Sequence, residues 1–357
     1  MTHIFVAPHP DDVALSCGGL INGLRELGQT VTILTVYSGA GGATSLSPYQ
    51  REALGYGNKA IWPASEAFNR ANLTNDYPVD ERFAPWGAET EKLDATQRDA
   101  DSAARRFWQR SSWYRRADIH NRSIEGQVLI DEVPTHGAVL TRELVEAENA
   151  GEIAAARRLE DERYALFAEA SVVFLDLPDA VYRGYEGDAE LLGQPHPDDE
   201  PPVSIVRREV NRLEPQRVYL PLGIGGHVDH QLLREVGLAL LNEEPGWVMP
   251  GPDWPGRVVY YEDFPYAWWN EFNHLADLPP GSLANLPDDV SLVPEYADIS
   301  EEIEKKIVGI DLYRSQMGPL FGGTKAMANA VRAHGRRVAA LGGLGSFAER
   351  YWVSTPI

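Results

Sequence analysis

The sequence predicts an α/β protein with a Rossmann-like, mostly parallel sheet and helices on both of its faces. Short apolar runs of strand type alternate with longer segments whose apolar residues recur at helical spacing. Such alternation is typical of parallel sheets built from strand–helix units. The expected strands are residues 3–8, 30–36, 171–177, 217–222 and 257–262. The expected helices lie near residues 14–27, 141–169, 229–242 and 300–316.

The first strand and the first helix enclose a polar string. Residues 3–8 (HIFVAP) form the strand, and residues 14–27 (ALSCGGLINGLREL) show helical spacing until Gly28 ends the pattern. Between them stands Pro8-His9-Pro10-Asp11-Asp12. The string therefore follows the carboxyl end of a strand, which is where open α/β sheets bind their ligands.

His9 and Asp12 in this string are three residues apart. If the chain coils into a first helical turn, both side chains lie on one face and Asp11 between them points elsewhere. One carboxylate can then bind a metal ion while its neighbour stays free as a base. A string of this kind standing alone is more often a turn with an Asx cap. Its position between a strand and a helix is what favours a site.

A second polar string follows the strand expected at residues 217–222. After the loop GIGG comes His227-Val228-Asp229-His230, and a helical pattern continues from there. His230 would complete a His, Asp, His set of nitrogen and oxygen ligands, which suits Zn²⁺ and leaves a fourth position for water. Structural zinc sites more often use four ligands rich in Cys, and this chain has one Cys. The pattern therefore predicts a catalytic site.

These two strings, together with other stretches, resemble the PIG-L (LmbE-like) family of zinc-dependent N-deacetylases. The resemblance covers nearly the whole chain except residues of about 58–150. The matching stretches are PHPDDVALSCGGLI, VTILTVYSGAGG, RRLEDE, FLDLPDAVYR, PLGIGGHVDHQ, YYEDFPYAWW, YRSQ near Tyr313 and AERYW near Trp352. The sequence departs from the pattern at Val13, where many members have Glu, and Val13 is not a ligand candidate.

The resemblance implies roles for seven residues. His9, Asp12 and His230 would be the zinc ligands, with another divalent transition metal as an alternative. Asp11 would be the general base that activates water, and His227 would stabilise the oxyanion or protonate the leaving amine. For substrate binding, Arg157 would touch the substrate and Asp179 would bind sugar hydroxyls. The implied reaction removes an N-acetyl group from an N-acetylglucosamine-like amino sugar or its glycoside.

Some of these residues also have ordinary structural explanations. Arg157 could instead form an ion pair within its helix, with Glu160 or Asp161. Asp229 is expected to cap the following helix rather than to orient a ligand histidine. The letters HPDD recur at residues 196–199, where acidic and proline residues follow and no apolar strand precedes. We expect that copy to be an exposed acidic loop without a metal.

Residues of about 58–150 interrupt the alternation of strands and helices. This stretch has an Arg-rich segment and four of the nine Trp: Trp62, Trp86, Trp108 and Trp113. We expect an inserted, mainly helical subdomain at 58–150, with residues 1–57 and 151–357 forming the deacetylase-like domain. Loops at this end of a sheet overhang the ligand site, so the insertion could be a lid. Packing against another subunit and a small aromatic core are the alternatives.

Composition limits the partners and the compartment. A net charge of −21 disfavours nucleic acid and acidic membranes, since phosphate binding depends on Lys and Arg. The N-terminus shows no signal-peptide pattern, and no apolar run is long enough to span a membrane. A single Cys allows no internal disulfide, which fits a cytoplasmic protein. The expected partner is a small-molecule or glycan amide, and the oligomeric state stays open.

Two other functions also stay open. One is an amidase that acts on a thiol conjugate or another amide. The other is a non-catalytic Rossmann-like module that binds a sugar or a nucleotide, with the His and Asp residues serving as caps and core.

Overall fold

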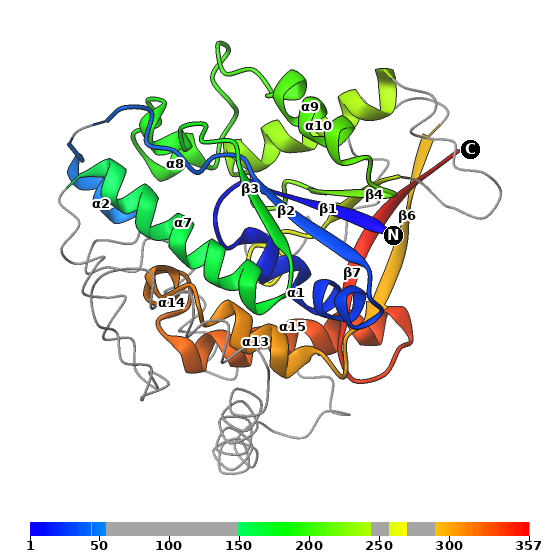
Figure 1. Cartoon of the computed structure of the whole chain (residues 1–357). Coiled ribbons are helices and arrows are strands. Elements are labelled where there is room, and N and C mark those ends of the chain that lie inside the picture. Colours follow the sequence, from blue (N-terminus) through cyan, green and yellow to red (C-terminus); the bar gives the residue numbers. More distant parts are fainter. Residues whose placement is uncertain (44, 55–148, 244–256, 270–289, 357) are drawn as a thin grey trace.

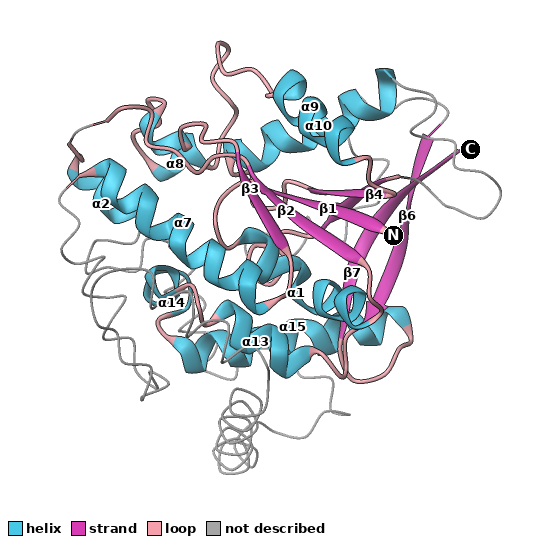
Figure 2. Ribbon diagram, viewed as in Figure 1, coloured by secondary structure: helices cyan, strands magenta, loops and turns pink. Residues whose placement is uncertain are grey.

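The computed structural model describes residues 1–43, 45–54, 149–243, 257–269 and 290–356. A sheet of seven strands crosses this part of the chain in the order β3-β2-β1-β4-β5-β7-β6 (Figure 2). The strands are β1 (Thr2–Ala7), β2 (Thr30–Thr35), β3 (Ser171–Phe174), β4 (Arg217–Pro221), β5 (Val258–Tyr261), β6 (Val290–Asp298) and β7 (Ala348–Pro356). The first five pair in parallel, whereas β7 is antiparallel to both β5 and β6. The predicted mostly parallel α/β fold is confirmed.

Helices cover both faces of the sheet (Figure 1). One face carries α9 (Val203–Leu213) and α10 (Val228–Glu243). The other carries α1 (Asp12–Glu26), α7 (Ala150–Phe167), α13 (Ile303–Ile310), α14 (Arg314–Phe321) and α15 (Thr324–Gly342). The short helices are α2 (Pro48–Ala53), α8 (Asp188–Leu191) and the 3₁₀ turn η1 (Ala180–Tyr182). None of the described helices is both long and apolar enough to cross a membrane.

The core lies in two layers because the central strands are buried on both sides. In β1, Phe5 and Ala7 belong to the core under α1, α7 and α13, whereas Ile4 and Val6 belong to the core under α9 and α10. All four are at most 1% exposed. A continuous apolar run with period-two alternation between two cores is the expected sequence of a parallel strand covered on both faces.

Several elements differ from the sequence prediction. The helix expected at 300–316 is two helices, because the chain turns between Ile310 and Arg314. The antiparallel strands β6 and β7 were not predicted; β6 contains Pro294, which a strand tolerates at the edge of a sheet. The predicted insertion at 58–150 and its Trp residues lie almost wholly outside the described residues, so that subdomain stays a proposal.

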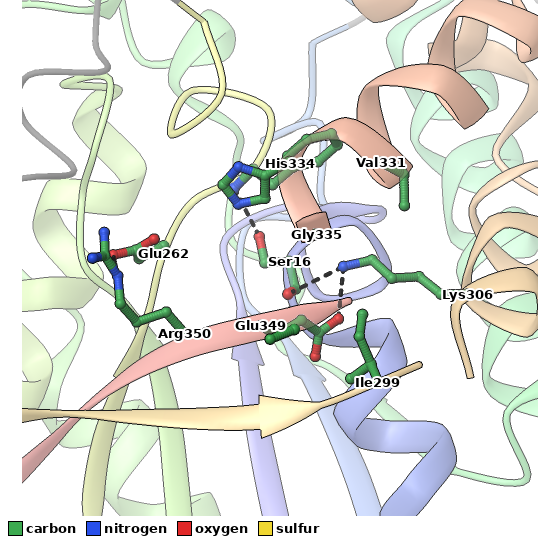
Figure 3. Close-up of a pocket in the computed structure, with 11 residues that line it drawn as sticks. Ser16, Glu262, Ile299, Lys306, Val331, His334, Gly335, Glu349 and Arg350 are labelled. Carbon is green, nitrogen blue, oxygen red and sulfur yellow. Dashed lines mark hydrogen bonds and ion pairs between the residues drawn. The ribbon is translucent and has the colours of Figure 1, made fainter. Parts of the chain in front are cut away.

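A buried ion pair between α13 and β7 also holds α1 in place (Figure 3). Lys306 Nζ in α13 lies 2.6 Å from Glu349 Oε1 in β7, and both side chains are 5% exposed. Glu349 also accepts hydrogen bonds from the backbone N–H groups of Gly19 (2.9 Å) and Leu20 (2.8 Å). A Cβ at Gly19 would lie 2.6 Å from Ile299 Cγ2, so the close approach requires glycine. This contact fixes the helix whose first residue is Asp12.

Lys306→Met should reduce the free energy of unfolding by about 3 kcal/mol, because it leaves the Glu349 carboxylate buried without its cation. Denaturant unfolding followed by circular dichroism measures the loss. Lys305→Met is the matched control: the neighbouring Lys305 pairs with Glu26, whose side chain is 57% exposed, and its loss should cost less than about 1 kcal/mol. Equal losses in the two variants would contradict the importance of the buried pair.

Candidate metal and active site

The two polar strings meet where the strand order reverses. β1 pairs with β2 on one side and with β4 on the other, all in parallel. Helices after β1 and β4 pack on opposite faces (Figure 1), and open α/β sheets bind their ligands at the carboxyl ends of the strands at such a point. The loop after β1 carries His9, the loop after β4 carries His227, and His230 lies in the first turn of α10. The sheet topology therefore brings together strings that are more than half the chain apart.

Three of the predicted residues converge at this point. Asp12 Oδ2 lies 3.2 Å from His9 Nδ1 and 3.4 Å from His230 Nε2. One ligand atom from each residue lies within 4.8 Å of the other two, and all three residues are buried. Two imidazole nitrogens and one carboxylate oxygen form a donor set that suits zinc and related divalent metals. The residues present therefore fit a metal ion.

Asp12 faces His9 for a different local reason than expected. α1 begins at Asp12, so His9 lies in the turn before the helix and not within its first turn. The Asp12 side chain reaches back, and its Oδ2 accepts a hydrogen bond from the backbone N–H of His9 at 2.8 Å. Burial would raise the pKa of Asp12, but the nearby His230 and His9 lower it to about 2. Asp12 is thus an anion that contacts both histidines.

In each of the two histidines, the ring nitrogen that does not face Asp12 contacts a second carboxylate. His230 Nδ1 lies 2.7 Å from Asp263 Oδ1, and His9 Nε2 lies 2.9 Å from Asp229 Oδ2. Both aspartates are at most 1% exposed. A carboxylate on the outer nitrogen fixes the tautomer and the ring orientation of a ligand histidine. The arrangement leaves His9 Nδ1 and His230 Nε2 to face Asp12.

The role expected for Asp229 is wrong. Its carboxylate does not cap α10 but accepts hydrogen bonds from His9, from the backbone N–H of Ala180 (3.1 Å) and from Arg183. The start of α10 is capped by His227, whose Nδ1 accepts a hydrogen bond from the Asp229 N–H at 3.2 Å. Asp229, at the start of α10, thus contacts His9, which lies in the loop after β1.

That same cap determines how His227 can act. Because Nδ1 is an acceptor, the ring proton of the neutral form is on Nε2. Burial and the nearby His9 and His230 lower the pKa of His227 well below its usual value. Its ring centroid lies 4.8 Å from that of His9 and 5.2 Å from that of His230. His227 is therefore a neutral hydrogen-bond donor beside the converging residues.

The loop that leads to His227 depends on a glycine. Gly225 has φ +95, and a Cβ on it would lie 2.3 Å from Cδ1 of Tyr266. Only glycine combines this backbone conformation with that close approach. The GIGG loop thus places the first turn of α10, which carries His230, next to Asp12.

Asp11 is buried beside Asp12 but is held differently. It has φ 109 immediately before α1, a conformation that L-residues rarely adopt. Within the described residues, no group donates a hydrogen bond to its carboxylate. Burial and the negative charge of Asp12 raise the pKa of Asp11 well above its usual value. The Asp11 carboxylate therefore favours a proton more than an ordinary aspartate does.

The two residues expected to bind substrate also lie at this site. Arg157 Nη1 in α7 lies 3.4 Å from Asp179 Oδ2, and that oxygen lies 3.8 Å from His9 Nε2. The alternative acids near Arg157 have other partners: Glu160 accepts from Ser315, and Asp161 accepts from Thr35 and Tyr313. The structure thus gives Arg157 an ion pair with Asp179, next to the metal-binding candidates.

The second HPDD copy lies beside the site rather than in it. The His196 ring stacks on Tyr185 at 4.0 Å between ring centroids. Asp198 is exposed, as expected of an acidic loop. Asp199 departs from that expectation, because its side chain is 18% exposed and forms an ion pair with Arg183.

Residues 4–72 match the family model described as PIG-L, GlcNAc-PI de-N-acetylase. The predicted PIG-L resemblance is confirmed. A 2'-N-acetylparomamine deacetylase of Niallia circulans is 22% identical over 284 residues, which cover 76% of this chain and 69% of that protein. A deacetylase from teicoplanin biosynthesis, solved as a complex with bog, has a TM-score of 0.55 and 17% identity, covering 100% of this chain and 99% of that chain. A zinc-inhibited form of teicoplanin deacetylase Orf2 gives 0.53, with the same identity and coverage. The two solved structures confirm the α/β fold.

Sequence reasoning missed Asp263 and Arg183. Asp263 follows the predicted strand at 257–262 directly, so the argument that selected Asp179, an acid at the end of a strand, applies to it equally. Arg183 stands in FLDLPDAVYR, a stretch that resembles the PIG-L family, but nothing in its spacing points to Asp229. Its role depends on a contact across 46 residues.

Proposed function

We propose that this chain is a zinc-dependent N-deacetylase that removes an N-acetyl group from an N-acetylglucosamine-like amino sugar or its glycoside. The observation that carries the proposal is the convergence of His9, Asp12 and His230 beside the unengaged carboxylate of Asp11. The family description and the name of the Niallia circulans relative both refer to removal of N-acetyl groups, which supports the same reaction.

His9, Asp12 and His230 are the better of two possible ligand sets. His9, His227 and Asp229 also lie within 4.8 Å of one another. However, the Asp229 carboxylate is already bound by the Arg183 guanidinium and by a backbone N–H, and a cation there would have to displace them. Zinc on the first set would act as a Lewis acid and lower the pKa of water from 15.7 to about 7.

Each remaining residue has a stated part in the hydrolysis. A carboxylate oxygen of Asp11 accepts a proton from the attacking water and passes it to the amide nitrogen as the C–N bond breaks. His227 Nε2–H donates a hydrogen bond to the carbonyl oxygen as negative charge develops on it. Arg157 and Asp179 bind polar groups of the sugar. The products are acetate and the free amine.

Acetate release from a panel of N-acetylated sugars tests the reaction and the substrate class together. We expect release from N-acetylglucosamine glycosides and its loss when a chelator removes the metal. Hydrolysis of a thiol-conjugate amide without hydrolysis of any sugar would favour the amidase alternative. No hydrolysis and no bound metal would favour the non-catalytic module.

His9→Ala, Asp12→Ala and His230→Ala should each lose bound zinc, because each removes one of three protein ligands. Metal analysis of the purified proteins measures the loss. His196→Ala is the matched control, since His196 precedes the same Pro-Asp-Asp sequence outside the site, and it should retain about the parent content. Metal loss in His196→Ala equal to that in His9→Ala would overturn the ligand assignment.

Asp11→Asn should keep near-normal zinc and lose most of kcat, by about a hundred- to ten-thousand-fold. The amide can still hydrogen-bond to water but cannot accept its proton. Single-turnover kinetics at matched metal content separate the chemical step from binding. An Asp11→Asn protein that hydrolyses at the parent rate would assign the base to another residue.

A further inference from the structure

A chain of ion pairs connects the second HPDD copy to His9. The Asp229 carboxylate accepts a hydrogen bond from His9 Nε2 through Oδ2 and one from Arg183 Nη2 through Oδ1. The same Nη2, together with Nε, also contacts Asp199: Oδ2 of Asp199 lies 2.8 Å from Nη2 and 3.0 Å from Nε. Asp199, Arg183, Asp229 and His9 therefore form one continuous line of charged contacts.

The guanidinium of Arg183 is fixed from every side. Its Nη1 donates to the backbone carbonyl of Pro178 at 2.6 Å, and its plane lies over the Tyr37 ring, 4.7 Å from the centroid. Asp199 is itself fixed by the hydroxyl of Tyr185 at 3.0 Å. The side chains of Arg183 and Asp199 are 14% and 18% exposed. Such a charge-assisted, multidentate contact has a defined geometry, unlike an exposed surface pair.

The line of contacts also divides the positive charge of Arg183 between two aspartates. Asp229 is completely buried and holds the outer nitrogen of His9. If Asp199 were absent, the guanidinium would be free to neutralise Asp229 alone. Asp229 would then be a weaker acceptor for the His9 N–H, and His9 would be a weaker electron donor through Nδ1.

We propose that Arg183 and Asp199 are positioning residues that orient His9 through Asp229. The HPDD copy at residues 196–199 is thus a support of the metal site that contributes its last aspartate and binds no metal itself. This inference rests on the proposed function, because it takes His9 to be a metal ligand.

Paired Ala substitutions in the second copy test this inference. Asp199→Ala should weaken zinc affinity about three- to tenfold, less than the roughly 10- to 100-fold loss typical of a direct partner of a ligand. Asp198→Ala removes the same charge from the adjacent, exposed position and should leave the affinity unchanged. Chelator competition on the full-length protein measures both dissociation constants. Asp199→Asn, which keeps one acceptor oxygen for Arg183, should recover part of the affinity.

A spectroscopic measurement separates positioning from general stability. In the Co²⁺-substituted protein, Asp199→Ala should shift the visible absorption bands because the ligand field of His9 changes, whereas Asp198→Ala should not. Lower thermal stability of the metal-free Asp199→Ala protein with an unchanged Co²⁺ spectrum and unchanged affinity would overturn the inference. Equal affinities of the two Ala variants in a parent that binds zinc would overturn it while leaving the proposed function intact. A parent protein that binds no zinc would overturn both.

Discussion

The parallel pairing of β1 with β4 is the constraint on which the site depends. The register places His3 opposite Arg217 and Phe5 opposite Tyr219, so the two strands end at the same level of the sheet. Their exit loops then lie side by side, although His9 and Asp229 are 220 residues apart in the chain. The strand order reverses between β1 and β4, which is where open α/β sheets bind their ligands. Residues from distant parts of the chain can therefore form a metal-binding cluster at this point.

Several carboxylates are buried around the candidate site, and their partners differ. Two of its buried carboxylates have a basic partner of their own: Asp263 is held by His230, and Asp229 by Arg183. Asp11 and Asp12 are adjacent, and both lie in the same buried region. Buried charges are stable only when they are paired or when they coordinate a metal. The proposed divalent ion would add positive charge beside Asp12, where the His9, Asp12 and His230 donor atoms converge.

The sequence predicts local features of this site well and long-range ones poorly. The five parallel strands and the His9, Asp12, His230 set follow from short patterns, because periodicity and spacing act within one element. The carboxylates that contact the two histidines do not follow from such patterns. Asp263 reaches His230 only because β5 pairs with β4 in a particular register. Asp229 was assigned to the nearest helix end, the local solution, whereas its partner His9 comes from another loop.

The backbone at Asp11 explains how two consecutive aspartates can differ in function. α1 begins at Asp12, and the residue before it has φ 109, a conformation that glycine adopts readily and aspartate does not. Holding a non-glycine residue there costs on the order of 1–3 kcal/mol. A glycine at position 11 would remove this strain, but it would also remove the carboxylate. The chain therefore carries the acidic group and its conformational cost together. The Asp12 carboxylate reaches back to the backbone N–H of His9, whereas no described group donates a hydrogen bond to the Asp11 carboxylate. The strain thus lies where the proposed reaction needs one carboxylate to bind and its neighbour to stay free.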